Sequence, residues 1–232
     1  MLMLLPIVVA LAAADPAPAA SSAPPPTPLK EIGRVRALPA CVPIVAHANG
    51  AITQALDNDR TLAILSTNLH NTDFDKLNFM QRRNAIESLM KQAEAMRVAS
   101  SAGDVEVKKL REYAVNSPDP KRKEELKTFA DALGGALYRQ KKAAVELMRD
   151  VTIMRGREDA AEARGLMRAA NPVPPSAVAQ VMANTPAILP GVPDSYNKQF
   201  KGVADTLDEM TKGILMDEGT AADHSIAATA GC

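Results

Sequence analysis

The feature that most constrains the fold of this chain is a long repeat of apolar residues in its middle. Between residues 126 and 154, apolar side chains return at steps of three and four residues, the spacing that places them on one face of an α-helix. A helix with so long a seam must bury that face against other helices. The step from Gln140 to Ala144 is one four-residue step more than a strict heptad allows, which relaxes a supercoil locally. The seam consists of Leu126, Phe129, Leu133, Ala136, Gln140, Ala144, Leu147, Val151 and Met154.

A second seam lies nearer the C-terminus, and Asp194 before it is suited to cap the start of a helix. It consists of Tyr196, Phe200, Val203, Leu207, Met210 and Ile214. Helical periodicity also covers residues 44–69, 77–96 and 107–114. We expect polar residues at 57–59 and 100–103 to interrupt these helices, and residues 71–73 to end one helix and cap the next. The prolines within residues 117–120 predict a further stop.

Composition favours the same class of fold. Aromatic residues make up only 3% of the 232 residues and Trp is absent, which argues against an all-β sandwich. The sequence therefore predicts an all-α protein: an elongated, antiparallel (up-and-down) bundle of four to five long helices over residues 40–217. We expect residues 218–232 to form a flexible C-terminal tail. The proline-rich residues 171–193 keep several apolar side chains, and we interpret them as a crossover strap packed on the bundle, with a binding lip as the alternative.

The N-terminal residues resemble an export signal. Residues 1–14 form an apolar run that ends in three alanines, too short to span a bilayer and typical of a cleaved signal peptide, although no Lys or Arg precedes Lys30. Residues 15–39 begin with a Pro/Ala/Ser-rich stretch that predicts a disordered tether. We therefore expect a periplasmic or secreted protein with no membrane span after signal cleavage.

The chain has two cysteines, Cys41 and Cys232, and Cys232 is the last residue. Export makes a disulfide chemically permissible. A bridge between them would close nearly the whole mature chain, a restraint of roughly 5 kcal/mol in the chain-entropy model. We predict an intramolecular Cys41–Cys232 disulfide, with intermolecular pairing or free thiols as the alternatives.

Motifs for catalysis are absent from the sequence. It contains no H-E-x-x-H, C-x-x-C, G-x-S-x-G or Walker-type loop, and no Glu-x-x-His pair of the kind that builds a di-metal site in a bundle. His47 and His70 are expected to be half-buried or helix-terminal residues rather than metal ligands, and the eleven methionines to be core filler. We therefore expect no catalytic residue, no metal site and no cofactor.

Charge and composition narrow the choice of partner. Lys and Arg balance Asp and Glu at 27 each, and no aromatic residues interleave with the basic runs, so a nucleic-acid binder is not expected. We expect a non-catalytic binding or structural module that meets a protein partner through a helical face, or a second copy of itself. The alternative is a small-molecule or metal-binding helical bundle of the periplasm.

Overall fold

The computed structural model describes residues 27–32, 41–170 and 195–229, and within this part of the chain every regular element is a helix. The helices are α1 (Val42–Asn71), α2 (Phe79–Asn116), α3 (Pro120–Ala170) and α5 (Tyr196–Ala228). The all-α prediction is confirmed, with four helices in the described residues and no fifth. None of them is both long enough and apolar enough to cross a membrane.

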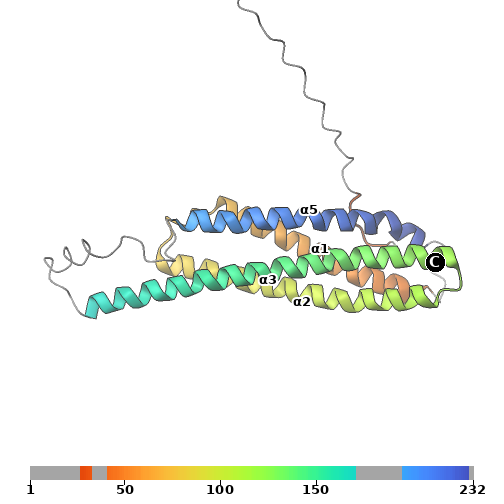
Figure 1. Ribbon diagram of the computed structural model, residues 1–232, viewed down its shortest axis with the longest axis horizontal. Coiled ribbons are helices and arrows are strands. Elements are labelled where there is room, and N and C mark those ends of the chain that lie inside the picture. Colours follow the sequence, from red (N-terminus) through yellow and green to blue (C-terminus); the bar gives the residue numbers. More distant parts are fainter. Residues whose placement is uncertain (1–26, 33–40, 171–194, 230–232) are drawn as a thin grey trace, which may run out of the picture.

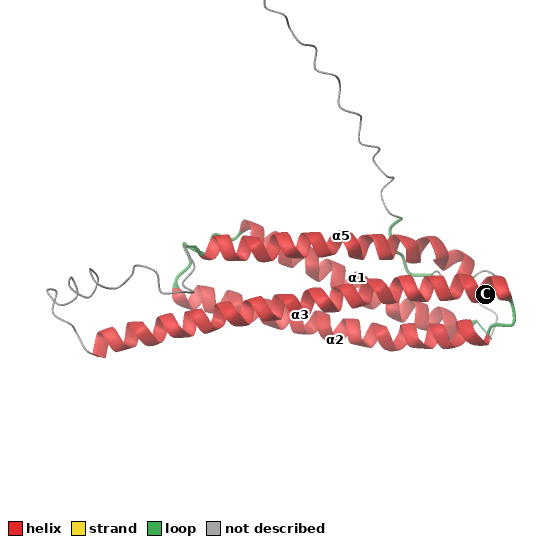
Figure 2. Ribbon diagram, viewed as in Figure 1, coloured by secondary structure: helices red, strands yellow, loops and turns green. Residues whose placement is uncertain are grey.

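The four helices lie side by side along the long axis of the molecule (Figure 1), and the described links between them are short (Figure 2). Ion pairs join α2 to α3 along their length: Arg82 pairs with Glu158 near the start of α2, and Arg111 with Asp131 nearer its end. The end of α3 projects beyond α2 (Figure 1).

The ends of the helices follow from local side-chain chemistry. Asn78 and Gln81 form a capping box at the start of α2, each side chain accepting the backbone N–H of the other. Residues 71–73 were therefore wrongly predicted to cap this helix. Ser195 caps α5 by accepting the N–H of Lys198, while the predicted cap Asp194 lies outside the described residues. The predicted stop at residues 117–120 is confirmed, since α2 ends and α3 begins there.

Two predicted interruptions are wrong, because α1 runs unbroken through residues 57–59 and α2 through residues 100–103. Three of the residues that suggested breaks, Asn58, Ser100 and Gly103, are instead buried in the bundle interior. Asn58 and Ser100 are buried and bond to each other. Gly103 lets α2 approach α3 closely, since a Cβ there would lie 2.8 Å from both terminal methyl carbons of Leu137.

The core is divided into two apolar clusters along the bundle, and the residues of the 126–154 seam are all buried. The first, the Phe200 cluster, holds the C-terminal half of α1 against the other helices. Phe200 stacks on Phe74 there, with ring centroids 3.7 Å apart. The second, the Phe129 cluster, lies around the N-terminal half of α1.

The described parts of the predicted tether and of the predicted C-terminal tail pack on the bundle. Residues 27–32, placed in the predicted tether, pack on α1: Leu29 is buried, and Asn49 exchanges two hydrogen bonds with the backbone of Ile32, at 2.7 and 3.0 Å. Helix α5 continues past the predicted end of the bundle at residue 217 to Ala228, and Ala221 is fully buried. The rest of the tether and the strap at 171–193 lie outside the described residues.

Candidate functional site

A layer of polar side chains separates the two apolar clusters, and every helix of the described bundle contributes to it. We define the polar layer as Asn58 and Asp59 of α1, Ser100 of α2, Gln140 of α3 and Glu218 of α5. Gln140 and Ser100 are completely buried, and Glu218 is only 3% exposed. Burying such groups is costly unless they bond to one another, so the pairing within the layer determines what it can do.

Gln140 is the hub of the layer. Its amide nitrogen donates to the Ala55 carbonyl at 3.0 Å, to Asp59 Oδ1 at 2.9 Å and, more weakly, to Glu218 Oε1 at 3.3 Å. The Gln140 amide oxygen accepts from Asn58 Nδ2 at 3.0 Å. Asn58 Nδ2 also donates to Ser100 Oγ at 2.9 Å. One glutamine therefore links α1, α3 and α5 directly, and α2 through Asn58.

The two carboxyl groups of the layer, Asp59 and Glu218, shift each other's pKa. Burial, followed by the neighbouring Asp59 carboxyl and then Asp217, raises the pKa of Glu218 to about 9. Burial also raises the pKa of Asp59 above 3.8, although its hydrogen bonds with Glu218 and Gln140 oppose this effect. Two adjacent buried carboxyl groups cannot both ionise cheaply, so at neutral pH Glu218 is the protonated partner of Asp59.

The sequence pattern did not predict this layer. Gln140 was assigned to the seam, Asn58 and Ser100 to helix breaks, and Glu218 to a flexible tail. The one signal present in the sequence is Gln140 itself, a polar residue at a seam position that must find partners when it is buried.

All three histidines bond to a carboxylate on a different helix. His47 Nδ1 lies 2.6 Å from Glu106, His70 Nε2 lies 3.0 Å from Asp208, and His224 Nδ1 lies 2.7 Å from Glu125. His47 is half-buried and hydrogen-bonded, as expected, and His70 lies in the last turn of α1. Among the described residues, no group of three His, Cys, Asp or Glu side chains is placed to hold a metal ion.

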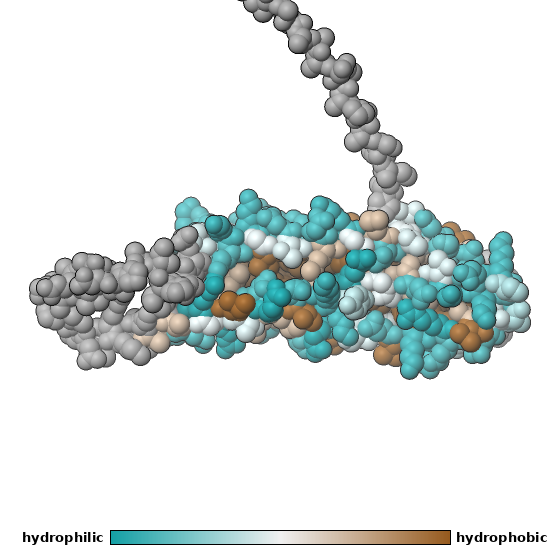
Figure 3. Space-filling view, in the orientation of Figure 1, coloured by the Kyte–Doolittle hydropathy of each residue, from teal (hydrophilic) through white to brown (hydrophobic). Residues whose placement is uncertain are grey.

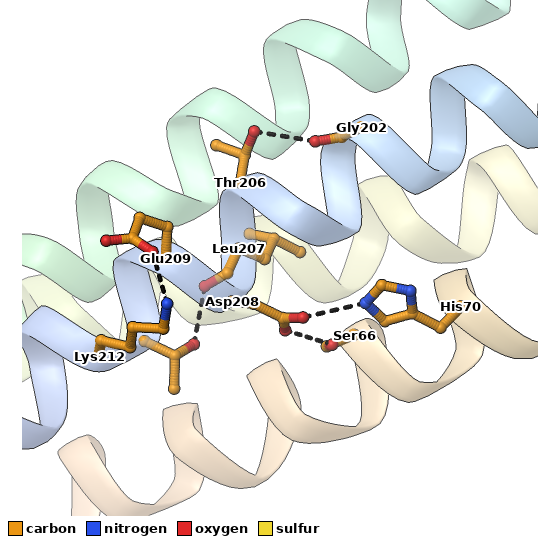
Figure 4. Close-up of polar contacts among 9 residues, drawn as sticks. Ser66, His70, Gly202, Thr206, Leu207, Asp208, Glu209 and Lys212 are labelled. Atoms are coloured by element: carbon orange, nitrogen blue, oxygen red, sulfur yellow. Dashed lines mark hydrogen bonds and ion pairs between the residues drawn. The ribbon is translucent and has the colours of Figure 1, made fainter. Parts of the chain in front are cut away.

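Asp208 brings a serine and a histidine together (Figure 4). Its Oδ1 accepts from Ser66 Oγ at 2.6 Å, and its Oδ2 lies 3.0 Å from His70 Nε2. In a hydrolytic triad the imidazole lies between hydroxyl and carboxylate and takes the hydroxyl proton. Here the carboxylate lies between the other two groups, so the Ser66 hydroxyl bonds to the carboxylate. This arrangement is a strut from α1 to α5, and its two hydrogen bonds lower the pKa of Asp208 below 3.8.

A buried ion pair closes the Phe200 end of the bundle. Glu158 is 1% exposed and accepts from Arg82 Nε at 2.8 Å. The Arg82 guanidinium also donates to the Leu77 carbonyl and lies 4.6 Å from the centre of the Tyr196 ring. Burial, followed by the Glu158 charge, raises the pKa of Tyr196 to about 12. Within the described residues the second carboxylate oxygen of Glu158 has no hydrogen-bond partner.

Cys41 lies at the opposite end, directly before α1. Its side chain is buried, and its sulfur lies 3.2 Å from a guanidinium nitrogen of Arg122 in α3. Cys232 lies outside the described residues, so the Cys41–Cys232 disulfide stays a prediction.

Comparison with known proteins gives no relative: no family model matches the sequence, and neither the curated proteins nor the solved structures contain a match.

Replacing Gln140, the hub of the polar layer, should destabilise the folded protein. In Gln140→Leu the Ala55 carbonyl, Asp59 and Asn58 each lose a buried partner, so we expect unfolding to require about 2–4 kcal/mol less free energy. Urea unfolding followed by circular dichroism measures the change, with the exposed Lys142→Leu on the same helix as the control. A Gln140→Leu protein as stable as the wild type would show that the layer's hydrogen bonds do not hold the bundle together.

The Asp208 strut should contribute less to the stability of the folded protein in acid. Because the pKa of Asp208 is lower in the folded than in the unfolded chain, its contribution is present above pH 3.8 and is lost as pH falls through the folded value. Asp208→Asn should thus destabilise the protein at pH 7, and the difference from the wild type should be smaller at pH 3. Thermal unfolding at both pH values tests this, with the exposed Asp205→Asn as the control. A difference that stays constant with pH would contradict the account.

Proposed function

We propose that the protein is an exported, non-catalytic helical bundle that acts as a binding or structural module through the outer faces of its helices. The observation that carries this proposal is the polar layer: the titratable and amide groups in the interior bond to each other across all four helices. Their hydrogen-bonding capacity is directed inward, to hold the helices together. The outer faces are what the bundle presents to a partner.

The outer surface supports this proposal. It is mostly hydrophilic, with separate apolar patches on the face shown in Figure 3. Large apolar side chains recur one heptad apart on two helices: Val98 and Val105 on α2, and Tyr138 and Val145 on α3. Residues seven apart lie on one stripe of a helix, which is the spacing that pairs with another helix. The partner is thus a helical face of another protein or of a second copy of the chain.

We further propose the up-and-down, antiparallel architecture expected from the sequence, with residues 171–193 as the strap from α3 to α5. The start of α1 and the end of α5 lie at the same end of the bundle (Figure 1). Cys41 directly precedes α1, and Cys232 follows Ala228 by four residues. This proximity supports the intramolecular disulfide, which in turn is consistent with cleavage of residues 1–14 and a periplasmic or secreted location.

Native mass spectrometry of the exported protein, with and without reductant, tests the proposal. We expect a processed chain with no bound small molecule, as a monomer or a dimer, that gains the mass of two hydrogen atoms per chain on reduction. A retained non-protein mass would instead favour a small-molecule or metal-binding bundle. A mass unchanged by reductant would contradict the disulfide.

A further inference from the structure

We propose that the Asp59–Glu218 pair is a proton-binding latch that fastens the C-terminal third of α5 to the bundle. The latch holds while the two carboxyl groups share one proton. When that proton is lost in alkaline solution, residues 218–228 separate from α1 and α3 before the rest of the bundle opens.

The geometry of the pair requires a shared proton. The Gln140 amide nitrogen donates to both carboxyl groups, at 2.9 Å to Asp59 and 3.3 Å to Glu218, so the two groups lie around one donor. Glu218 is almost fully buried. A second negative charge at this position would repel the first in a medium of low dielectric constant.

The cations nearest in sequence to the hub are committed elsewhere. Arg139 bonds to Asp217 at 2.7 Å, and Lys141 pairs with Asp104 of α2 at 3.6 Å. From α2 the layer receives the neutral Ser100, and from α3 the neutral Gln140. On α5 the adjacent Asp217 adds a further negative charge beside Glu218. No ion pair from another described residue reaches Asp59 or Glu218, so protonation is the means of neutralising the pair.

The parts of α5 before and after the latch are held differently, which is why release begins beyond the latch. The part before Glu218 buries large side chains, including Phe200, Leu207 and Ile214. The part after Glu218 buries mainly small residues, and hydrophobic stabilisation scales with the apolar area buried. These residues are Gly219, Ala221, Ala222, Ser225 and Ala228. The latch and the His224–Glu125 hydrogen bond therefore carry a larger share of the attachment there.

The direction of the pH effect follows from proton linkage. The pKa of Glu218 rises from 4.5 in the unfolded chain to about 9 in the folded one. The folded chain therefore holds the extra proton over this range, and its contribution to stability is full below pH 4.5 and lost as pH rises through about 9. The latch is closed in acidic and neutral surroundings and opens in alkaline ones.

Hydrogen exchange of the full chain, measured by mass spectrometry from pH 6 to pH 10 and corrected for intrinsic exchange rates, tests this inference. We expect protection of residues 218–228 to fall by roughly tenfold for each pH unit between pH 6 and the folded pKa of Glu218 near 9, and to level off above it. Residues 200–214 should keep their protection. Glu218→Gln, which cannot ionise, should keep protection in both segments, and the exposed Asp223→Asn should behave like the wild type.

Two results would overturn the latch. One is a parallel loss of protection in the wild type and in Glu218→Gln, and the other is a loss spread evenly over all four helices. Asp59→Asn provides a second test if Glu218→Gln does not fold. With only one ionisable group left in the layer, its loss of protection at pH 10 should be smaller than that of the wild type, and an equal loss would count against the shared proton. None of these outcomes depends on the partner in the proposed function.

Discussion

The arrangement of this bundle depends on the burial of Gln140. Its amide is completely buried and bonds to the backbone of Ala55, to Asn58 and to the two carboxyl groups of the layer. If one helix slid by a turn of about 5.4 Å, these groups would remain buried but lose their partners. Apolar seams tolerate repacking much more readily. The polar layer therefore selects one register, while the two apolar clusters supply most of the stabilisation.

The partly exposed contacts between helices outside the polar layer have a different role. The histidine–carboxylate bonds and the strut at Asp208 join helices that the layer has already aligned. Partly exposed pairs of this kind contribute little to the free energy of folding, about 0–1 kcal/mol each. The buried Arg82–Glu158 pair is an exception, because removing Arg82 would leave an almost fully buried charge without compensation. It fixes the start of α2 against α3 at the Phe200 end.

The helical class and both seams could be predicted from the sequence, because the three- and four-residue period depends only on which face is buried. The polar layer could not be predicted from the sequence. Asn58 and Ser100 are residue types that favour helix caps and turns over helix interiors, and only their contact across α1 and α2 shows that they line the interior here. Glu218 lies among small and polar residues typical of a flexible end, and its burial depends on Asp59 and Gln140, which are distant in the sequence. The continuity of α1 and α2 was not predicted either, because Asn58 and Ser100 were interpreted as helix breaks.

The most direct test of the account is a carbon NMR titration of the Glu218 side-chain carboxyl in the folded protein. The structure predicts that this carboxyl is protonated at pH 7 and titrates near pH 9. The Asp59 carboxyl should respond in the same range because the two groups share one proton. An ordinary titration of Glu218 near pH 4.5 would contradict the account, because the layer would then hold two buried negative charges without a shared proton.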